Sequence, residues 1–393
     1  MRYLAAALLL CIQLPAAAQR VAVQFETADF AALQARARQE NRPVFLYFWS
    51  THCGPCVEMA RDVFPDSAVA RYYNATFRSF KVNLDSAEGK VLGTRYGVSV
   101  LPSFLYFDPA GKLLHRTVGG KPVAAFIQDG RDTFDPDKAY YTLKARYEAG
   151  ERSPAFLRAF SGAPGLGAEP ELGRRVSDEY LHTQSAAELA SLQNREYIFN
   201  QYQDLDAPST QYFLRHQPDF VGQFGAPAVA KRTRNIISQA GDEAGRKNDA
   251  AALVSLQKTI AQLMPAEADQ WQQLAQLHYL LGQHPRDWPA YAKAAQIYGR
   301  QFAKRDSQTL YEATVYMTAF IADKALLAQA GLIIQLALAA DPSAPNLLAR
   351  AKLLHKLGDD AQAAAAAWAS VAAAACTGEN TDEANSLLAE LSK

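Results

Sequence analysis

The sequence lacks an excess of charge of either sign: among its 393 residues, 40 lysines and arginines balance 40 aspartates and glutamates. Binding to nucleic acid or to an anionic membrane surface depends on an excess or a cluster of positive charge. We therefore expect neither among the partners of this protein. Apolar residues make up 49% of the chain, which is ordinary for a globular protein.

Long apolar runs are also missing, apart from one at the start of the chain. Met1-Arg2 carries positive charge, residues 4–14 are largely apolar, and the small residues 16–18 follow Pro15. This order is typical of a cleaved signal peptide, and the run is too short to remain as a membrane anchor. We expect residues 1–18 to be a signal peptide cut after Ala18, and the mature protein to be periplasmic or secreted with no membrane span. A buried N-terminal helix is the alternative.

Cysteine is scarce, and the four residues in the chain are too few for a framework of structural disulfides in an exported protein. Beyond the first segment remain Cys376, which we expect to pack as a small apolar residue in an alanine-rich stretch, and the pair Cys53 and Cys56. A structural zinc site wants four ligands, and no second cysteine pair exists; His52 adds one donor in poor geometry. We therefore expect no metal, and no cofactor other than a redox-active Cys53–Cys56 disulfide.

The two cysteines follow a segment with the pattern of a buried strand. Residues 44–49 are continuously apolar, and Cys53-Gly54-Pro55-Cys56 comes directly after them, where a helix would begin. At a helix N-terminus the unpaired N–H groups and the helix dipole favour a thiolate, here at Cys53. Cys56 lies one turn further in, close enough to attack a mixed disulfide formed by Cys53. The spacing predicts thiol–disulfide exchange.

Around this pair, residues 19–135 alternate between strand-like and helix-like segments. Apolar periodicity predicts strands at 21–25, 44–49 and 77–84, a hairpin at 103–107 and 112–117, and helices at 29–40, after Cys53, at 89–96 and from 121 onward. We therefore predict an α/β domain with a mixed sheet flanked by helices.

Four motifs in this region follow one another at fixed distances. They are Phe48-Trp49-Ser50-Thr51-His52-Cys53-Gly54-Pro55-Cys56, Lys81-Val82-Asn83-Leu84-Asp85, Tyr96-Gly97-Val98-Ser99-Val100-Leu101-Pro102-Ser103 and the late Gly119. In order and spacing the region resembles the thioredoxin superfamily. Asp62-Val63-Phe64 and Asn74-Ala75-Thr76-Phe77 resemble in particular its exported, thioredoxin-like branch. The resemblance implies a thioredoxin-like fold and a thiol–disulfide oxidoreductase.

The resemblance also assigns roles. Cys53 is similar to the attacking thiol of the family and Cys56 to the resolving thiol. Pro102 matches the cis-proline that helps to bind an extended substrate, and Trp49 resembles the tryptophan under the active-site helix. The Gly-Pro pair between the cysteines is typical of reducing members, so we expect a fairly reducing couple.

Two positions depart from the pattern of the family. Typical thioredoxins carry a buried aspartate six residues before the first cysteine, whereas this chain has Tyr47 there. Proton handling at the resolving thiol must therefore differ, with Lys81, Glu58, Tyr47 itself or water as candidates. His52 stands where many thioredoxins have tryptophan; it either borders the substrate groove or, when protonated, stabilises the Cys53 thiolate.

Residues 136–393 show no strand signal and consist of helical segments separated by proline, glycine or aspartate. The less regular segment 161–170 is expected to be a loop or linker. Similar leucine and alanine patterns precede Gly282 and Gly358, about two tetratricopeptide-like units apart. We predict an all-α domain, either of degenerate tetratricopeptide-like helix pairs or as an irregular bundle. Its histidines, among them His278, are expected to be surface or capping residues.

These features predict an exported thiol–disulfide oxidoreductase that reduces protein disulfides, with the helical domain binding a client or a partner. A reducing pair in an oxidising compartment needs an electron source, and we expect a membrane thiol carrier to supply it. Two alternatives to this interpretation remain. The first is a helical-repeat binding or scaffold protein whose thioredoxin-like domain is a redox switch. The second is a disulfide oxidase or isomerase.

Overall fold

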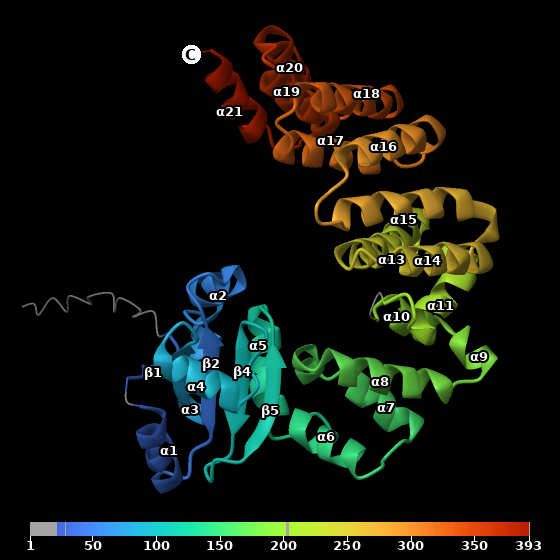
Figure 1. Cartoon of the computed structure of the whole chain (residues 1–393). Helices are drawn as coiled ribbons and strands as arrows, with labels where there is room; N and C mark the ends of the chain where they lie inside the picture. Colours follow the sequence, from blue (N-terminus) through green and yellow to red (C-terminus); the bar gives the residue numbers. More distant parts are fainter. Residues whose placement is uncertain (1–21, 28, 202–203, 393) are drawn as a thin grey trace, which may run out of the picture. The chain divides into compact units, whose positions relative to one another are not determined.

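The computed structural model describes residues 22–27, 29–201 and 204–392. The chain folds as two compact units that part between Ser185 and Ala186 (Figure 1). The expected signal peptide, residues 1–18, lies outside the described residues. The predicted domain limits of 19–135 and 136–393 stay a prediction.

The N-terminal unit is built on a five-stranded sheet with the order β1-β3-β2-β4-β5. β1, β3 and β2 are parallel, and β4 is antiparallel to its neighbours β2 and β5. The strands are β1 (Phe25–Glu26), β2 (Val44–Trp49), β3 (Arg78–Asn83), β4 (Ser103–Phe107) and β5 (Leu113–Val118). The helical elements are α1 (Phe30–Gln39), α2 (Gly54–Glu58), η1 (Met59–Val63), α3 (Ser67–Thr76), α4 (Ala87–Arg95), α5 (Val123–Asp132), α6 (Tyr140–Glu148), α7 (Pro154–Ser161), η2 (Pro164–Ala168) and α8 (Pro170–His182).

Strand β2 lies in the middle of this sheet, and its side chains alternate between two apolar cores. Phe45 and Tyr47 face the core that also contains α2, α3, α5 and both cysteines of the CxxC motif. Leu46 and Phe48 face the opposite core, formed with α1 and α4. Because helices cover both faces, the strand is apolar throughout, which is why the sequence revealed it.

The predicted fold class is confirmed: a mixed sheet flanked by helices, followed by a largely helical region. The strands expected at 44–49 and 103–107 match β2 and β4, and the strand expected at 77–84 contains β3. Of the strand expected at 21–25, only Phe25 belongs to a strand: β1 consists of Phe25 and Glu26, which pair with β3.

Helices α6–α8 continue the N-terminal unit beyond α5. Segment 161–170 is therefore not a linker: η2 packs on β5, and the chain returns in α8. The glycines of this segment allow close approach. A Cβ on Gly165 would lie 2.4 Å from the ring of Tyr140, and one on Gly167 would lie 2.6 Å from Cγ2 of Val118. Flexibility and close packing both favour glycine, so the sequence did not distinguish them.

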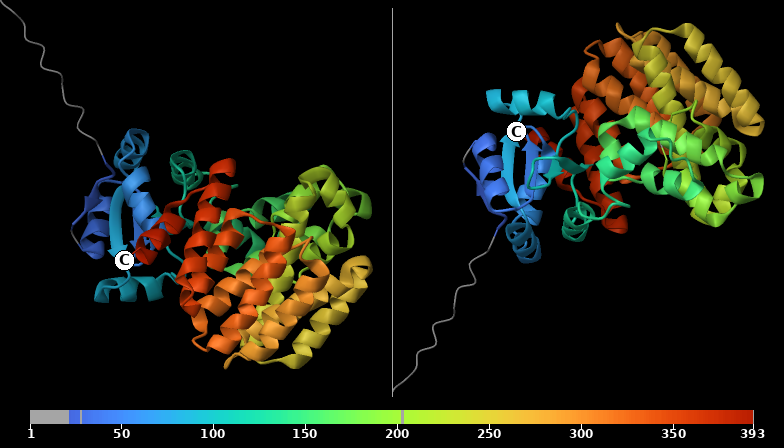
Figure 2. Two further views of the ribbon diagram at one scale, coloured as in Figure 1. Left: turned by 90° about the horizontal axis from the view of Figure 1, so that it is seen from above. Right: turned by 90° about the horizontal axis from the view of Figure 1, so that it is seen from below.

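The C-terminal unit consists of helices throughout its described residues. They are α9 (Ala186–Leu189), α10 (Leu192–Phe199), α11 (Pro208–Arg215), α12 (Gln217–Phe224), α13 (Ala226–Arg246), α14 (Ala250–Leu263), η3 (Pro265–Glu267), α15 (Ala268–Gly282), α16 (Trp288–Phe302), α17 (Ser307–Phe320), α18 (Lys324–Ala340), α19 (Ala344–Leu357), α20 (Asp360–Thr377) and α21 (Asp382–Leu391). From α13 onward each helix packs on its successor, and Figures 1 and 2 show these helices side by side.

Cys376, expected to pack inside, is exposed near the end of α20. The buried stripe of this helix runs through Ala363, Ala367, Ser370 and Ala374, and Cys376 lies off it. The prediction was wrong because nearly every residue in this alanine-rich stretch is small and apolar, so composition does not reveal which face is buried. In the part of the chain that the structure describes, no helix is both long and apolar enough to cross a membrane.

Candidate active site

Cys53 and Cys56 are joined by a disulfide at the start of α2. Cys53 is the N-cap residue of the helix, and its Sγ accepts the N–H of Cys56 at 3.2 Å. Pro55 occupies the first turn, where its missing N–H costs no hydrogen bond. Cys56 is 2% exposed and Cys53 9%. A first-turn N–H, that of Cys56, is therefore directed at the sulfur nearer the surface, which together with the helix dipole favours a thiolate at Cys53 after reduction.

The loop before β4 approaches the disulfide from the sheet. Its Leu101–Pro102 peptide bond is cis, and Leu101 packs on the core cluster that contains both cysteines. The carbonyl of Pro102 accepts the N–H of Gly119 at 2.9 Å, and the Ser103 hydroxyl donates to the Val100 carbonyl at 2.7 Å. These bonds fix the cis-proline loop against the end of β5.

The loop after β5 forms a third part of the site. Gly119 has a φ of +84°, which favours glycine. A Cβ on Gly120 would lie 3.2 Å from Cβ of Pro55, and the N–H of Lys121 donates to Sδ of Met59 at 3.4 Å. The loop after β5 therefore adjoins both the active-site helix and the cis-proline loop.

A cavity of about 510 Å³ lies on the Cys56 side of the disulfide. Tyr47, Trp49 and Lys81 contribute to its largely apolar wall, together with Cys56. The Tyr47 hydroxyl donates to the carbonyl of Cys56 at 3.4 Å, and burial raises the pKa of Tyr47 to about 12. Tyr47 is therefore a neutral hydrogen-bond donor at physiological pH, not a base.

The candidates for proton handling lie on two sides of the active-site helix. Lys81 lines the cavity beside Cys56, with its Nζ 5.9 Å from the ring centroid of Phe25. Glu58 lines a different hollow of about 320 Å³, together with Met59 and Lys121. The structure thus brings Tyr47, Trp49 and Lys81 to the cavity that Cys56 lines and places Glu58 elsewhere.

His52 is exposed beside Cys53, at the end of a hydrogen-bonded chain. Thr51 donates its N–H and its hydroxyl to one oxygen of Asp85, at 3.1 and 2.9 Å, and these bonds hold the pKa of Asp85 below its ordinary value. Because the hydroxyl hydrogen is used in this way, the Thr51 oxygen accepts from Nδ1 of His52 at 3.1 Å. Sequence reasoning assigned no role to Thr51 or Asp85, although both lie within the quoted motifs.

A buried ion pair supports the loop after β5, and the sequence did not reveal it. Nζ of Lys121 lies 2.8 Å from Oδ2 of Asp129, which also accepts the Thr117 hydroxyl at 2.8 Å. Burial raises the pKa of Asp129, while Lys121 and Thr117 oppose that shift. No sequence signal distinguishes this aspartate from a surface acid on a helix, because its burial depends on how α5 packs.

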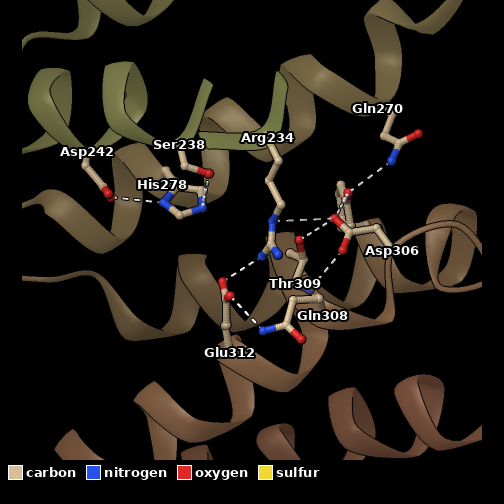
Figure 3. Close-up of polar contacts among 10 residues, drawn as sticks. Arg234, Ser238, Asp242, Gln270, His278, Asp306, Gln308, Thr309 and Glu312 are labelled. Atoms are coloured by element: carbon tan, nitrogen blue, oxygen red, sulfur yellow. Dashed lines mark hydrogen bonds and ion pairs between the residues drawn. The ribbon is translucent and has the colours of Figure 1, made fainter. Parts of the chain in front are cut away.

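The C-terminal unit contains a polar cluster that the sequence also did not reveal (Figure 3). The His278 side chain, expected at the surface, is only 14% exposed. Its Nε2 lies 2.8 Å from the Ser238 hydroxyl, and its Nδ1 lies 3.1 Å from Oδ1 of Asp242. This is the order of a serine–histidine–aspartate triad. Ser238 and Asp242, however, lie inside α13, whose N–H groups are used in helix hydrogen bonds and leave none to stabilise an oxyanion.

The same cluster connects three helices. Arg234 of α13 pairs with Glu312 of α17 at 2.6 Å and lies 4.0 Å from Asp306, the N-cap of that helix (Figure 3). His278 joins α15 to α13 in the same way. We therefore assign the cluster a structural role, which is to hold α13 against α15 and α17.

The fold and the site together define a class of protein. A mixed sheet of this topology, a CxxC disulfide at a helix N-terminus and a cis-proline loop beside it form a thioredoxin-like oxidoreductase fold with one redox-active disulfide. Within the described ranges, no group of three or more histidine, cysteine, aspartate or glutamate side chains is placed to hold a metal ion.

Comparison with known proteins gives the family. Residues 30–132 match the thioredoxin-like domain family. Thioredoxin 1 of Nostoc sp. is 30% identical over 86 residues, which are 22% of this chain and 75% of that protein. The thioredoxin of Streptomyces clavuligerus is 27% identical over 97 residues, 25% of this chain and 84% of that protein. Through its N-terminal domain, the chain belongs to the thioredoxin family.

Solved structures resemble the same fraction of the chain. A thioredoxin from Thermus thermophilus is 30% identical and covers 28% of this chain and 85% of its own, with a TM-score of 0.26. The C-terminal domain of DsbD from Neisseria meningitidis, in its oxidised form, is 24% identical and covers 28% and 99%, with a TM-score of 0.25.

Proposed function

We propose that this protein is an exported thiol–disulfide oxidoreductase that reduces disulfides in other proteins. One observation carries the proposal: the Sγ of Cys53 caps a helix N-terminus at the edge of the surface, and Cys56 lies buried within reach of it. This arrangement separates a reactive thiol from a resolving thiol, as disulfide exchange requires. The helical region would bind a client or a partner.

The reaction moves two electrons and two protons. In the reduced protein, the Cys53 thiolate attacks a client disulfide and forms a mixed disulfide, releasing one client sulfur as a thiolate that takes up a proton. The Cys56 thiol then loses its proton, attacks Sγ of Cys53 and releases the second client thiol. The client disulfide is reduced to a dithiol, and the protein is oxidised to the Cys53–Cys56 disulfide.

The resolving step needs an acceptor for the Cys56 proton. Tyr47 is neutral up to high pH because its pKa is about 12, so it does not accept the proton. Lys81 shares the cavity with Cys56, and a positive charge there favours the thiolate form. We propose that the proton leaves to water through this cavity while Lys81 stabilises the Cys56 thiolate.

Reduction of insulin by the purified protein, with dithiothreitol as electron donor, tests the proposed activity. The wild type is expected to reduce the insulin disulfides, and Cys53→Ser is expected to lose this activity because no attacking thiolate remains. Cys56→Ser is expected to accumulate mixed disulfides on Cys53, which mass spectrometry of trapped partners would identify. Insulin reduction that survives Cys53→Ser contradicts the role given to this residue.

The direction of the reaction depends on the reduction potential of the pair. We expect a reducing couple recharged by a membrane thiol carrier, because Gly54 and Pro55 are typical of reducing members. Equilibration with glutathione buffers measures the potential. A value well above that of the glutathione couple would instead assign the protein to disulfide formation or isomerisation.

A further inference from the structure

Strand β5 is the outer strand of the sheet, and a helical extension covers it. Within the N-terminal unit, α6 and η2 both pack on β5, and Figure 1 shows α6 next to β5. The contact with η2 includes Gly167, where a Cβ would lie 2.6 Å from Cγ2 of Val118. Val118 is the last residue of β5 and pairs with Ser103, the residue after the cis-proline.

This contact lies next to the redox site. Gly119, which follows Val118, donates its N–H to the carbonyl of Pro102 at 2.9 Å. Gly120, the next residue, lies against Pro55 between the two cysteines. A continuous path therefore runs from the active-site helix over the loop after β5 to Val118, and from there to Gly167 on η2.

Hydrogen bonds and close packing hold the extension in this position. The N–H of Tyr140, the first residue of α6, donates to Nδ1 of His115 on β5 at 2.9 Å. The Tyr140 hydroxyl donates to Glu169, which follows η2, at 2.8 Å, and Gly165 lies directly against the Tyr140 ring. Arg116 of β5 is 3% exposed and donates to the carbonyl of Tyr96, in the segment that leads to the cis-proline. β5 thus connects the extension to the cis-proline segment.

We propose that η2 is a specificity element of the redox site and binds the client polypeptide beside the disulfide under attack. The proposal rests on the proposed function. A client held by the cis-proline loop continues over Val118 and Gly119 onto the exposed residues Pro164 and Gly167. Residues 162–168 carry no charged side chain, and Val100 beside the cis-proline is 37% exposed. The surface therefore suits an extended, uncharged polypeptide segment rather than a small disulfide.

Two substrates separate this role from the chemistry of the disulfide. A small disulfide such as 5,5′-dithiobis(2-nitrobenzoic acid) reaches Cys53 without touching η2, whereas an insulin chain extends beyond the disulfide. Pro164→Glu places a charge on the exposed side of η2, and Gly167→Glu adds both a charge and a side chain against Val118. Both variants keep every residue of the redox site.

The experiment measures kcat/KM of the full-length protein for both substrates. Pro164→Glu is expected to lower the value for insulin by about fivefold, the effect of about 1 kcal/mol on the transition state, and to leave the small disulfide within twofold. Gly167→Glu is expected to act in the same direction and more strongly. Ala110→Glu is the control, because it adds the same charge in the exposed turn at the opposite end of the β4–β5 hairpin.

The outcomes are distinguishable. If the wild type reduces neither substrate, the proposed function fails and this inference fails with it. If the wild type reduces both and Pro164→Glu keeps the ratio of the two kcat/KM values, η2 does not bind the client and the proposed function stands. An equal loss on both substrates would mean that η2 only supports the fold, and would also overturn the proposal.

Discussion

At the scale of single residues, the chemistry of the resolving cysteine depends on what replaces the buried acid of typical thioredoxins. Tyr47 stands in that place, in the same cavity wall as Lys81. Tyr47→Phe is expected to leave the rate of insulin reduction within about twofold between pH 6 and 8, because its hydroxyl gives up no proton there. Lys81→Met is expected to slow closure of the disulfide by about tenfold, because it removes the positive charge beside Cys56. Stopped-flow measurement of mixed-disulfide resolution checks both.

A large effect of Tyr47→Phe together with none of Lys81→Met would contradict this assignment. Glu58→Gln is the matched control, because Glu58 lines the other hollow and does not line the cavity beside Cys56. Its resolution rate is expected to equal that of the wild type.

The burial of His115 leads to a testable prediction about the pH dependence of stability. It is 1% exposed, and burial lowers its pKa to about 4. The unfolded chain, with a histidine pKa near 6.5, therefore binds more protons than the folded chain between these values. This contribution to stability is fully present above about pH 6.5 and is lost as the pH falls towards 4, by about 3 kcal/mol. Urea unfolding of the N-terminal unit at pH 4 to 7 measures it.

The same protonation would also remove the acceptor of the Tyr140 N–H, because a doubly protonated imidazole has no free lone pair. The protection factor of the Tyr140 amide, which compares its exchange rate with that of an unfolded amide at the same pH, is therefore expected to fall below pH 5. His115→Phe should flatten the pH dependence of stability in this range. If His115→Phe keeps the full pH dependence of stability, groups other than His115 cause that dependence.

At the scale of elements, glycine decides how closely helices approach. Gly245 of α13 faces α15 so closely that a Cβ would lie 2.2 Å from the carbonyl oxygen of Tyr279. Gly245→Ala is expected to destabilise the C-terminal unit by about 2 kcal/mol, because backbone would have to move. Gly331→Ala, inside α18 with nothing within 4 Å of its Cβ, is the matched control and is expected to stabilise by up to about 1 kcal/mol. Chemical denaturation measures the free energy of unfolding of both variants. An equal change in the two variants would refute the close contact at Gly245.

The elements differ in how well the sequence predicted them. β2 and β4 were found because strands covered on both faces are mostly apolar; Ser103 is the polar residue at the start of β4. Segment 161–170 was misjudged, because the glycines that let η2 lie against Val118 and Tyr140 have the composition of a flexible linker. The burial of Asp129 and the partial burial of His278 were missed for a related reason: both depend on packing partners on other elements.

At the scale of the whole molecule, all residues of the proposed redox site belong to the N-terminal unit, which extends to Ser185. A fragment of residues 19–185 is expected to reduce the small disulfide within about twofold of the full-length rate. A fragment of residues 19–135, the predicted thioredoxin-like domain, lacks α6–α8 and exposes His115, Arg116 and Val118. It is expected to be less stable by about 2 kcal/mol or more, because the buried polar side chains of β5 lose their cover. Thermal denaturation measures the stability of both fragments, and the rate at which each reduces the small disulfide measures its activity.

Equal stability of the two fragments would show that the α/β domain ends near residue 135 as predicted and that the extension is only an appendage. The expected result would instead make α6–α8 part of the folding unit that carries the disulfide.

The sequence by itself determined the sheet, the CxxC disulfide at a helix start and the candidate cis-proline, because each depends on neighbours in the chain or on a recognisable spacing. Only the tertiary structure decided that Lys81, not Glu58, shares a cavity with Cys56, and that His278 is enclosed between Ser238 and Asp242. It alone also decided that η2 covers β5 beside the redox site. These arrangements depend on contacts between side chains that lie far apart in the sequence. Neither residue type nor periodicity indicates which distant residue will be the partner.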